Sequence, residues 1–295
     1  MFTINGLNGK PTRISGISFI GYKFTEEDNP TTRGISEVGA ADFRIDHCYF
    51  EDFCGAAISC KGHYGGVNRG VIDHCIIDNP YHDDPSVTGK DGGSKVWAYG
   101  VIVGGSGYED SWYPDINTLL GHYDGLRNIV YIEDCNFSRC RHAVSGSSIG
   151  GGFYVVRYCR VSKPRYGGML DVHGSWFSAP SVGGRGLEAY NNIIDGSDTG
   201  GKTFGSHFAF AIRGGGGVIY NNTIISCRDG AVALAREDAN PICAVKDLWI
   251  WNNTLTNTSP LIGNYGNYTE NVDYFLYAKP DYTPYPYPHP LTLQD

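Results

Sequence analysis

The sequence has no long hydrophobic run and no extended stretch with helical periodicity. No apolar run approaches the roughly 18 residues that span a bilayer, and no segment repeats apolar residues at i, i+3 and i+4 over several turns. Instead, β-branched and aromatic residues cluster in short runs bounded by Gly, Asn and Asp. These features predict an all-β chain without membrane insertion.

Positive charge is also scarce. The 295 residues include 23 Lys and Arg against 31 Asp and Glu, which gives a formal net charge of −8. An acidic chain is unsuited to nucleic acid or to an anionic membrane. A highly anionic polymer would be an awkward ligand unless a cation bridged the two.

What the sequence does contain is a repeat. Residues 218–224 read V-I-Y-N-N-T-I, and related blocks recur along nearly the whole chain. The copies are spaced by 24 to 60 residues, which is too uneven for α-helical repeats and fits coils of short strands separated by turns of variable length. One column of the alignment holds Ile17, Cys48, Cys75, Cys135, Cys159, Asn192, Asn222 and Asn253.

This pattern resembles the right-handed parallel β-helix, or pectate-lyase-like, superfamily, whose coils carry I-x-N-N-x-I with an asparagine ladder inside one sharp turn. The resemblance covers roughly residues 13 to 255 and implies a single-stranded solenoid of about eight coils, each with three strands. Four ladder positions are Cys, and we expect them to stack as interior thiols because a small, weakly polar thiol fills the same buried turn. The nine cysteines are an odd number and imply no disulfide framework.

The C-terminal segment cannot form another coil. Residues 274–295 are rich in Tyr and Pro, and proline removes the hydrogen-bond donors that a strand needs. We therefore expect a β-helix domain over residues 1–273 and an extended tail over 274–295. The tail is expected to pack on the solenoid or on a neighbouring subunit.

The third strand of each coil predicts a chemical centre. A strand periodicity of two places one residue of each coil in the core: Ile58, Ile102, Val144, Val172, Ile212 and Leu234. The same periodicity predicts that Val101 faces out. On the outer face, Asp171, His173 and Arg213 stand among small residues. Because stacked strands lie about 4.8 Å apart, these three should share one patch, which we interpret as the catalytic site.

Long insertions flank the same strand and should wall a groove above it. They lie near 78–98, 104–128, 174–186 and 195–207, and the resemblance implies a polysaccharide groove on this face. Aromatic planes beside polar groups suit sugars, which have apolar faces and polar edges. The residues expected to contact substrate are Trp97, Trp112, Tyr113, Trp176, Arg185, Lys202 and His207.

The predicted patch fits more than one chemistry. A β-eliminating lyase would use His173 as base and Arg213 as a clamp for the sugar carboxylate. A glycoside hydrolase would pair Asp171 with a loop carboxylate such as Asp195 or Asp198. A surface salt bridge that performs no chemistry is a further interpretation.

A second outward column precedes the ladder turn. Its upper part holds Asp46, Asp73 and Glu133, three stacked carboxylates whose repulsion a bound cation such as Ca²⁺, or a raised pKa, would relieve. A solvated acidic stripe is the simpler interpretation. The lower part holds Tyr190, Tyr220 and Trp251, which we expect to pack beneath the C-terminal segment or a neighbouring subunit.

Two hypotheses of function follow. The first is a carbohydrate-acting β-helix protein that binds and cleaves an extracellular or capsular polysaccharide. The second is a non-catalytic structural or adhesive subunit, such as a phage tail component or a self-assembling fibre, because open coil edges invite pairing with other chains in an oligomer or filament. Residues 1–10 lack the features of a signal peptide. The expected location is extracellular or virion-associated, and no cofactor other than Ca²⁺ is suggested.

Overall fold

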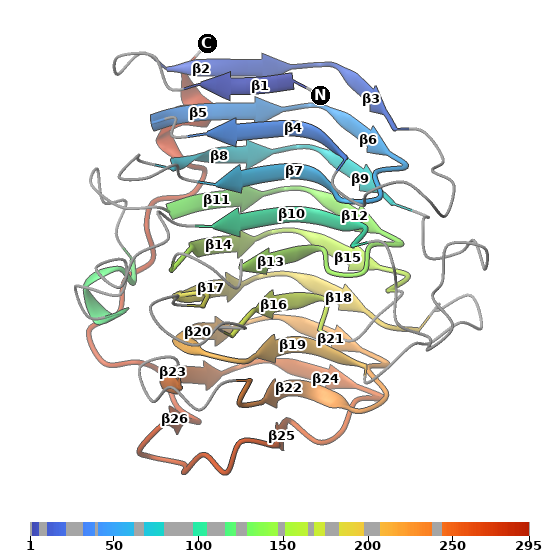
Figure 1. Cartoon of the computed structure of the whole chain (residues 1–295). Coiled ribbons are helices and arrows are strands. Elements are labelled where there is room, and N and C mark those ends of the chain that lie inside the picture. Colours follow the sequence, from blue (N-terminus) through green and yellow to red (C-terminus); the bar gives the residue numbers. More distant parts are fainter. Residues whose placement is uncertain are drawn as a thin grey trace.

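The chain folds as a single-stranded parallel β-helix. In the computed structural model, three parallel sheets run the length of the molecule, and each coil adds one strand to each sheet in chain order (Figure 1). This confirms the fold class that the repeat predicts. The structure describes residues 2–5, 11–21, 32–38, 41–61, 68–79, 97–104, 116–121, 129–146, 151–164, 168–174, 183–197, 207–237 and 244–294.

Sheet A is formed by the third strand of each coil. Its members are β1 (Phe2–Asn5), β4 (Arg33–Val38), β7 (Ala56–Lys61), β10 (Tyr99–Gly104), β13 (Val144–Gly146), β16 (Leu170–Val172), β19 (Phe208–Ile212), β22 (Gly230–Leu234) and β25 (Ile262–Asn264). Five of the six predicted inward residues belong to the core: Ile58, Val144, Val172, Ile212 and Leu234.

The predicted register of β10 is wrong by one residue. Val101 pairs with Ile58 and Val144 and lies in the core, whereas Ile102 pairs with Ser59 and Ser145 on the outer face. A one-residue slip exchanges the two faces of a strand. Here residues 101–103 are all apolar, so the sequence offers no alternation that distinguishes the faces.

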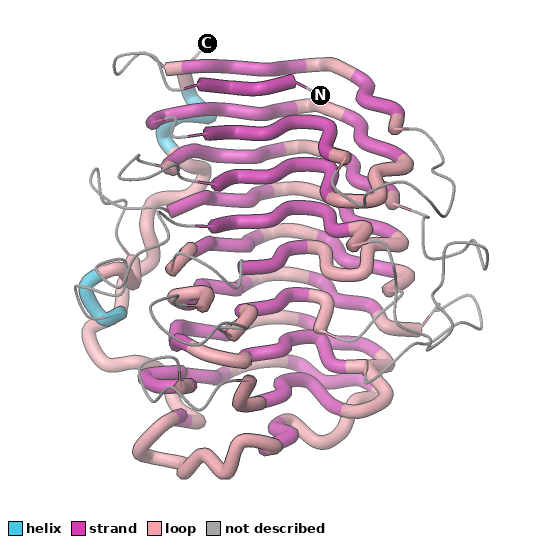
Figure 2. Tube along the Cα trace, in the orientation of Figure 1, coloured by secondary structure: helices cyan, strands magenta, loops and turns pink. Residues whose placement is uncertain are grey.

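Sheets B and C lie before and after the ladder turn. Sheet B contains β2 (Thr12–Ser15), β5 (Ala41–Asp46), β8 (Arg69–Asp73), β11 (Ile129–Glu133), β14 (Phe153–Arg157), β17 (Gly186–Tyr190), β20 (Gly215–Tyr220), β23 (Val245–Trp251) and β26 (Tyr274–Phe275). Sheet C contains β3 (Ser18–Ile20), β6 (Tyr49–Glu51), β9 (Ile76–Asp78), β12 (Asn136–Ser138), β15 (Arg160–Ser162), β18 (Ile193–Asp195), β21 (Thr223–Ile225) and β24 (Thr254–Thr256). The short 3-10 helices η3 (Ile116–Thr118) and η5 (Pro290–Leu293) are cyan in Figure 2.

The ladder turn is sharp because the residue before each ladder position has a left-handed backbone. Its φ is between 50° and 58° in seven successive coils, at His47, His74, Asp134, Tyr158, Asn191, Asn221 and Asn252. Asn, Asp and His, which supply six of these seven positions, are the side chains that tolerate this conformation best after glycine. The turn therefore directs the ladder side chain inward and the preceding side chain outward.

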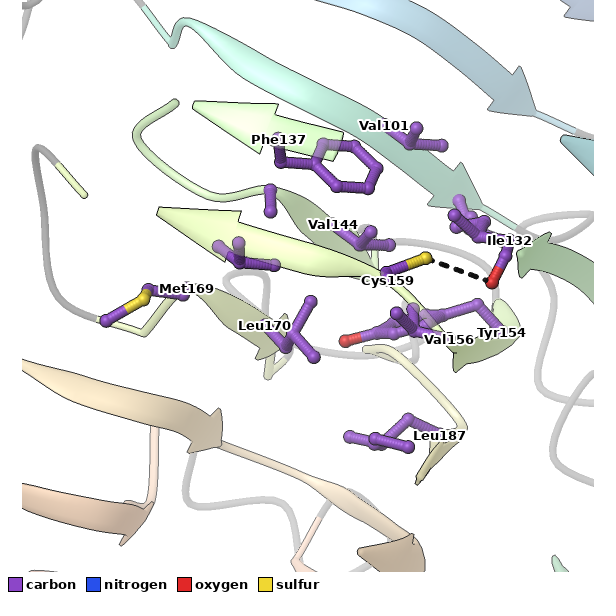
Figure 3. Close-up of a cluster of buried hydrophobic side chains, with 14 of the residues drawn as sticks. Val101, Ile132, Phe137, Val144, Tyr154, Val156, Cys159, Met169, Leu170 and Leu187 are labelled. Atoms are coloured by element: carbon purple, nitrogen blue, oxygen red, sulfur yellow. Dashed lines mark hydrogen bonds between the residues drawn. The ribbon is translucent and has the colours of Figure 1, made fainter. Parts of the chain in front are cut away.

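The ladder residues form a single file in which thiols and amides make the same contacts. The backbone N–H of Cys75 donates to Cys135 Sγ at 3.4 Å, and that of Cys159 donates to Asn192 Oδ1 at 2.9 Å. In the other direction, Cys159 Sγ donates to the carbonyl of Ile132 at 3.5 Å, drawn in Figure 3. Asn192 Nδ2 donates in the same way to Val156 O at 2.9 Å. The predicted stack of interior thiols is thus present.

The chain's own C-terminal segment covers the outer face of sheet B. From β26, residues 276–294 run back along the sheet toward β5, so both termini lie at the same end of the molecule (Figure 1). We call this segment the C-terminal strap. Its Tyr282 ring meets Tyr220 and Trp251 edge-on, at centroid distances of 5.9 and 6.2 Å.

Candidate functional site

The three residues predicted to form a catalytic patch do lie together on the outer face of sheet A. Asp171 is in β16, and Arg213 immediately follows β19 in the next coil. Arg213 donates from Nε and Nη2 to the two carboxylate oxygens of Asp171, at 2.9 and 2.6 Å. Ser145 adds a third hydrogen bond to Asp171, at 3.0 Å.

A fourth residue, Glu237, belongs to the same patch and was not predicted from the sequence. This carboxylate accepts a hydrogen bond from Arg213 Nη1 and lies 3.0 Å from His173 Nδ1. A signal for it was present, because the outward positions of β22 continue at a spacing of two residues through Ala235 to Glu237. We call Asp171, His173, Arg213 and Glu237 the sheet A cluster.

Electrostatics keep the two carboxyl groups and the guanidinium of the cluster ionised. Burial acts to raise the pKa of Asp171, which has no exposed surface, but Arg213 outweighs it and holds that pKa well below its usual range. Burial likewise acts to raise the pKa of Glu237, and His173 and Arg213 reverse the effect. Burial lowers the pKa of Arg213, yet the nearby Asp171 leaves it raised overall. Both carboxyl groups are therefore charged at neutral pH.

An aromatic pair lies at the start of β10. The Trp97 ring is 37% exposed and stacks on Tyr99 at a centroid distance of 6.2 Å. Tyr99 in turn lies 5.0 Å from the ring of His142. Burial lowers the pKa of His142 to about 3, so this imidazole is neutral. Trp97 is the predicted substrate contact that stands at the surface, but it precedes β10, and Val101 is in register with Leu170 and Phe210, so Trp97 lies at the end of sheet A opposite Arg213.

The other predicted contact residues do not gather at the cluster either. Arg185 and His207 are only 5% and 1% exposed. His207 precedes β19 and its backbone N–H donates to Asp229 at 2.6 Å, so it lies at the opposite end of that strand from Arg213. The remaining predicted contacts lie outside the described residues: Trp112, Tyr113, Trp176 and Lys202.

The predicted acidic column is buried, and a solvated stripe is the wrong description. Asp46, Asp73 and Glu133 have no exposed surface. Arginine takes the place expected for a cation: Arg13 donates to both oxygens of Asp46 at 2.8 and 3.0 Å, and Arg44 to both oxygens of Asp73 at 3.0 and 2.9 Å. Among the described residues, no group of three or more His, Cys, Asp or Glu side chains could hold a metal ion.

Arg157 joins the third carboxylate of this column to the strap. It donates to Glu133 from Nε at 2.9 Å and again from Nη2. Its remaining donors reach the Tyr190 hydroxyl at 2.7 Å and, in the strap, the carbonyls of Tyr285 and Pro286 at 2.6 and 2.7 Å. Burial nevertheless raises the pKa of Glu133, with Arg157 opposing the shift. The strap covers the acidic column, and arginine side chains of the solenoid itself neutralise its carboxylates.

No family model, curated protein or solved structure matches this chain. Within the part of the chain that the structure describes, no helix has the length and hydrophobicity needed to cross a bilayer. The assignment of function therefore depends on the geometry of the sheet A cluster and its surroundings.

Proposed function

We propose that the chain is a carbohydrate-acting member of the pectate-lyase-like superfamily that binds and cleaves an extracellular or capsular polysaccharide on the outer face of sheet A. The three parallel sheets and the continuous ladder support the superfamily. The observation that carries the function is the sheet A cluster, in which Asp171 holds the Arg213 guanidinium in a fixed orientation beside His173. A fixed guanidinium suits two-point recognition of a carboxylate.

Among the chemistries open to the cluster, β-elimination fits better than hydrolysis. Hydrolysis needs one carboxyl group that still carries a proton to give to the leaving oxygen. Asp171 and Glu237 both have lowered pKa values and cannot fill that role. Asp195, the loop partner that the sequence suggested, belongs to sheet C, where it hydrogen-bonds Ser197.

In the proposed reaction, Arg213 pairs with the carboxylate of an acidic sugar. His173 takes the proton from the adjacent ring carbon, while the Gly174 carbonyl and the Glu237 carboxylate, each 3.0 Å from Nδ1, orient the imidazole. The electron pair released forms a carbon–carbon double bond as the glycosidic carbon–oxygen bond breaks. The leaving oxygen then takes a proton from water.

The second candidate is a non-catalytic structural or adhesive subunit. The observation that favours it is the number of contacts within the sheet A cluster, where Arg213 bonds two carboxylates and Asp171 accepts from both Arg213 and Ser145. Such a network joins four successive coils, from β13 to β22. It would stabilise their stacking without touching a substrate.

A panel of acidic and neutral polysaccharides distinguishes the two candidates. We expect an unsaturated product absorbing at about 235 nm from an acidic polymer, and His173→Ala or Arg213→Ala should slow its formation at least ~100-fold. The matched control is Thr256→Ala, at an exposed position on the outer face of sheet C. Equal activity in all four proteins would contradict the proposed site. Inactivity on every polymer, together with concentration-dependent assembly in light scattering, would favour the structural subunit.

A further inference from the structure

Two exposed histidines stack on the turn between sheets B and C. His47 follows β5 and His74 follows β8, and both have the left-handed φ of 53° that directs the side chain outward. Their rings are parallel to within 5° and 4.9 Å apart between centroids. The side chains are 58% and 50% exposed.

Each of these imidazoles is oriented by a buried carboxylate. His47 Nδ1 lies 2.9 Å from Asp46 Oδ2, and His74 Nδ1 lies 3.0 Å from Asp73 Oδ2. A carboxylate that accepts from Nδ1 keeps the proton on that nitrogen and leaves the lone pair on Nε2. The same carboxylate–histidine arrangement orients the imidazole ligands of protein metal sites. Because both Nδ1 atoms point to buried groups, both Nε2 atoms point away from the solenoid, in register.

We propose that His47 and His74 together bind a divalent first-row transition-metal ion through their Nε2 atoms, with water completing its coordination. Imidazole is a preferred ligand of Cu²⁺, Ni²⁺ and Zn²⁺. Two nitrogens bound at 2.0–2.1 Å to a tetrahedral ion lie about 3.3 Å apart. The rings must therefore lean toward each other from their 4.9 Å stacking distance, and their exposure allows this movement without disturbing the core.

The charges around the pair are compatible with a bound cation. Arg13 and Arg44 balance the two supporting carboxylates, and the Ser15 hydroxyl donates a further hydrogen bond to Asp46 at 2.7 Å. The next residue at this turn position is Asp134, whose carboxylate accepts from the Tyr287 hydroxyl at 2.8 and 3.0 Å. Asp46 and Asp73, which the sequence suggested as metal ligands, thus act by orienting the histidine ligands. Ca²⁺ is unsuited to the pair, because it prefers six to eight oxygen ligands.

The test is calorimetric titration of the full chain with Cu²⁺, Ni²⁺, Zn²⁺ and Ca²⁺. His47→Asn and His74→Asn are the suitable variants, because the chain itself places Asn with a left-handed backbone at the same turn position in residues 191, 221 and 252. We expect one high-affinity ion per chain, tightest for Cu²⁺ and absent for Ca²⁺. Each single variant should weaken binding at least ~10-fold, and the double variant should remove it. Electron paramagnetic resonance of the Cu²⁺ form should show two coordinating nitrogens.

A gain-of-site variant isolates the contribution of the carboxylates. Asn191→His with Asn221→His puts two histidines at the same turn position of adjacent coils, where tyrosine replaces the preceding aspartate. This pair should bind 10- to 100-fold more weakly than the natural one. Equal affinity would refute the role of Asp46 and Asp73. A wild-type protein that binds none of the transition ions, or a double His→Asn variant that binds them unchanged, would overturn the proposal.

Discussion

Glu188 should make the stability of this protein depend on pH. It lies in β17 beneath the strap and has no exposed surface. Its Oε1 accepts from the backbone N–H of Gly121 at 2.6 Å, and its Oε2 accepts from the Tyr282 hydroxyl. Burial raises the pKa of this carboxyl from 4.5 to about 7, against the opposing effects of Tyr282, Gly121 and Arg157.

The size and sign of the effect follow from that pKa. In the unfolded chain Glu188 ionises near pH 4.5, whereas in the folded chain it stays protonated up to about pH 7. The stabilisation from this group is therefore complete below about pH 4.5 and is lost as the pH rises through 7. Moving the pKa of one carboxyl from 4.5 to about 7 corresponds to roughly 3 kcal/mol of the free energy of unfolding.

Glu188→Gln removes the titration while keeping an oxygen acceptor. In guanidinium denaturation followed by tryptophan fluorescence, the stability of this variant relative to wild type should increase by roughly 3 kcal/mol between pH 4.5 and 8. The matched control is Glu270→Gln, at an exposed position, which should show no such trend. A difference between Glu188→Gln and wild type that stays constant over this pH range would refute the reasoning.

Two further predictions concern the ladder and the strap. Cys135→Asn should keep the thermal midpoint of unfolding close to that of wild type, because Asn192 already makes both ladder contacts. Cys135→Ala should lower the free energy of unfolding by about 1–3 kcal/mol, because it leaves a buried N–H and C=O unsatisfied. Equal calorimetric midpoints for the two variants would contradict this. Arg157→Ala should cost about 3–5 kcal/mol of the free energy of unfolding because it leaves Glu133 buried without its partner, and limited proteolysis should then cut within residues 276–294. A strap as resistant to protease as in wild type would show that Arg157 does not hold it in place.

Much of the fold could be predicted because one kind of contact repeats. The ladder column fixes where every coil turns, and the turn fixes which residues precede sheet C. The same regularity brought Asp171 and Arg213 together from segments 42 residues apart. The prediction of register failed where polar and apolar residues do not alternate, as in the uniformly apolar run around Ile102.

The repeat could not predict that the acidic column is buried. Whether Asp46 and Glu133 face water depends on the strap, whose path along sheet B follows from contacts made once each and not from a recurring pattern. Glu237 was not predicted because it lies three residues beyond the end of β22, although the outward positions of that strand extend to it at a spacing of two residues. The roles assigned to the sheet A cluster stay predictions until a polymer is tested.

The strap also changes how the whole molecule should unfold. In an open solenoid each coil touches only its neighbours, so terminal coils fray independently and cooperativity decays with distance. Here Arg44 donates to the carbonyl of Thr292, 248 positions along the chain, at 3.2 Å. That contact joins the first coils to the end of the polypeptide, so unfolding of the coils at one end should release the other end. We therefore expect this solenoid to unfold cooperatively, in an all-or-none transition.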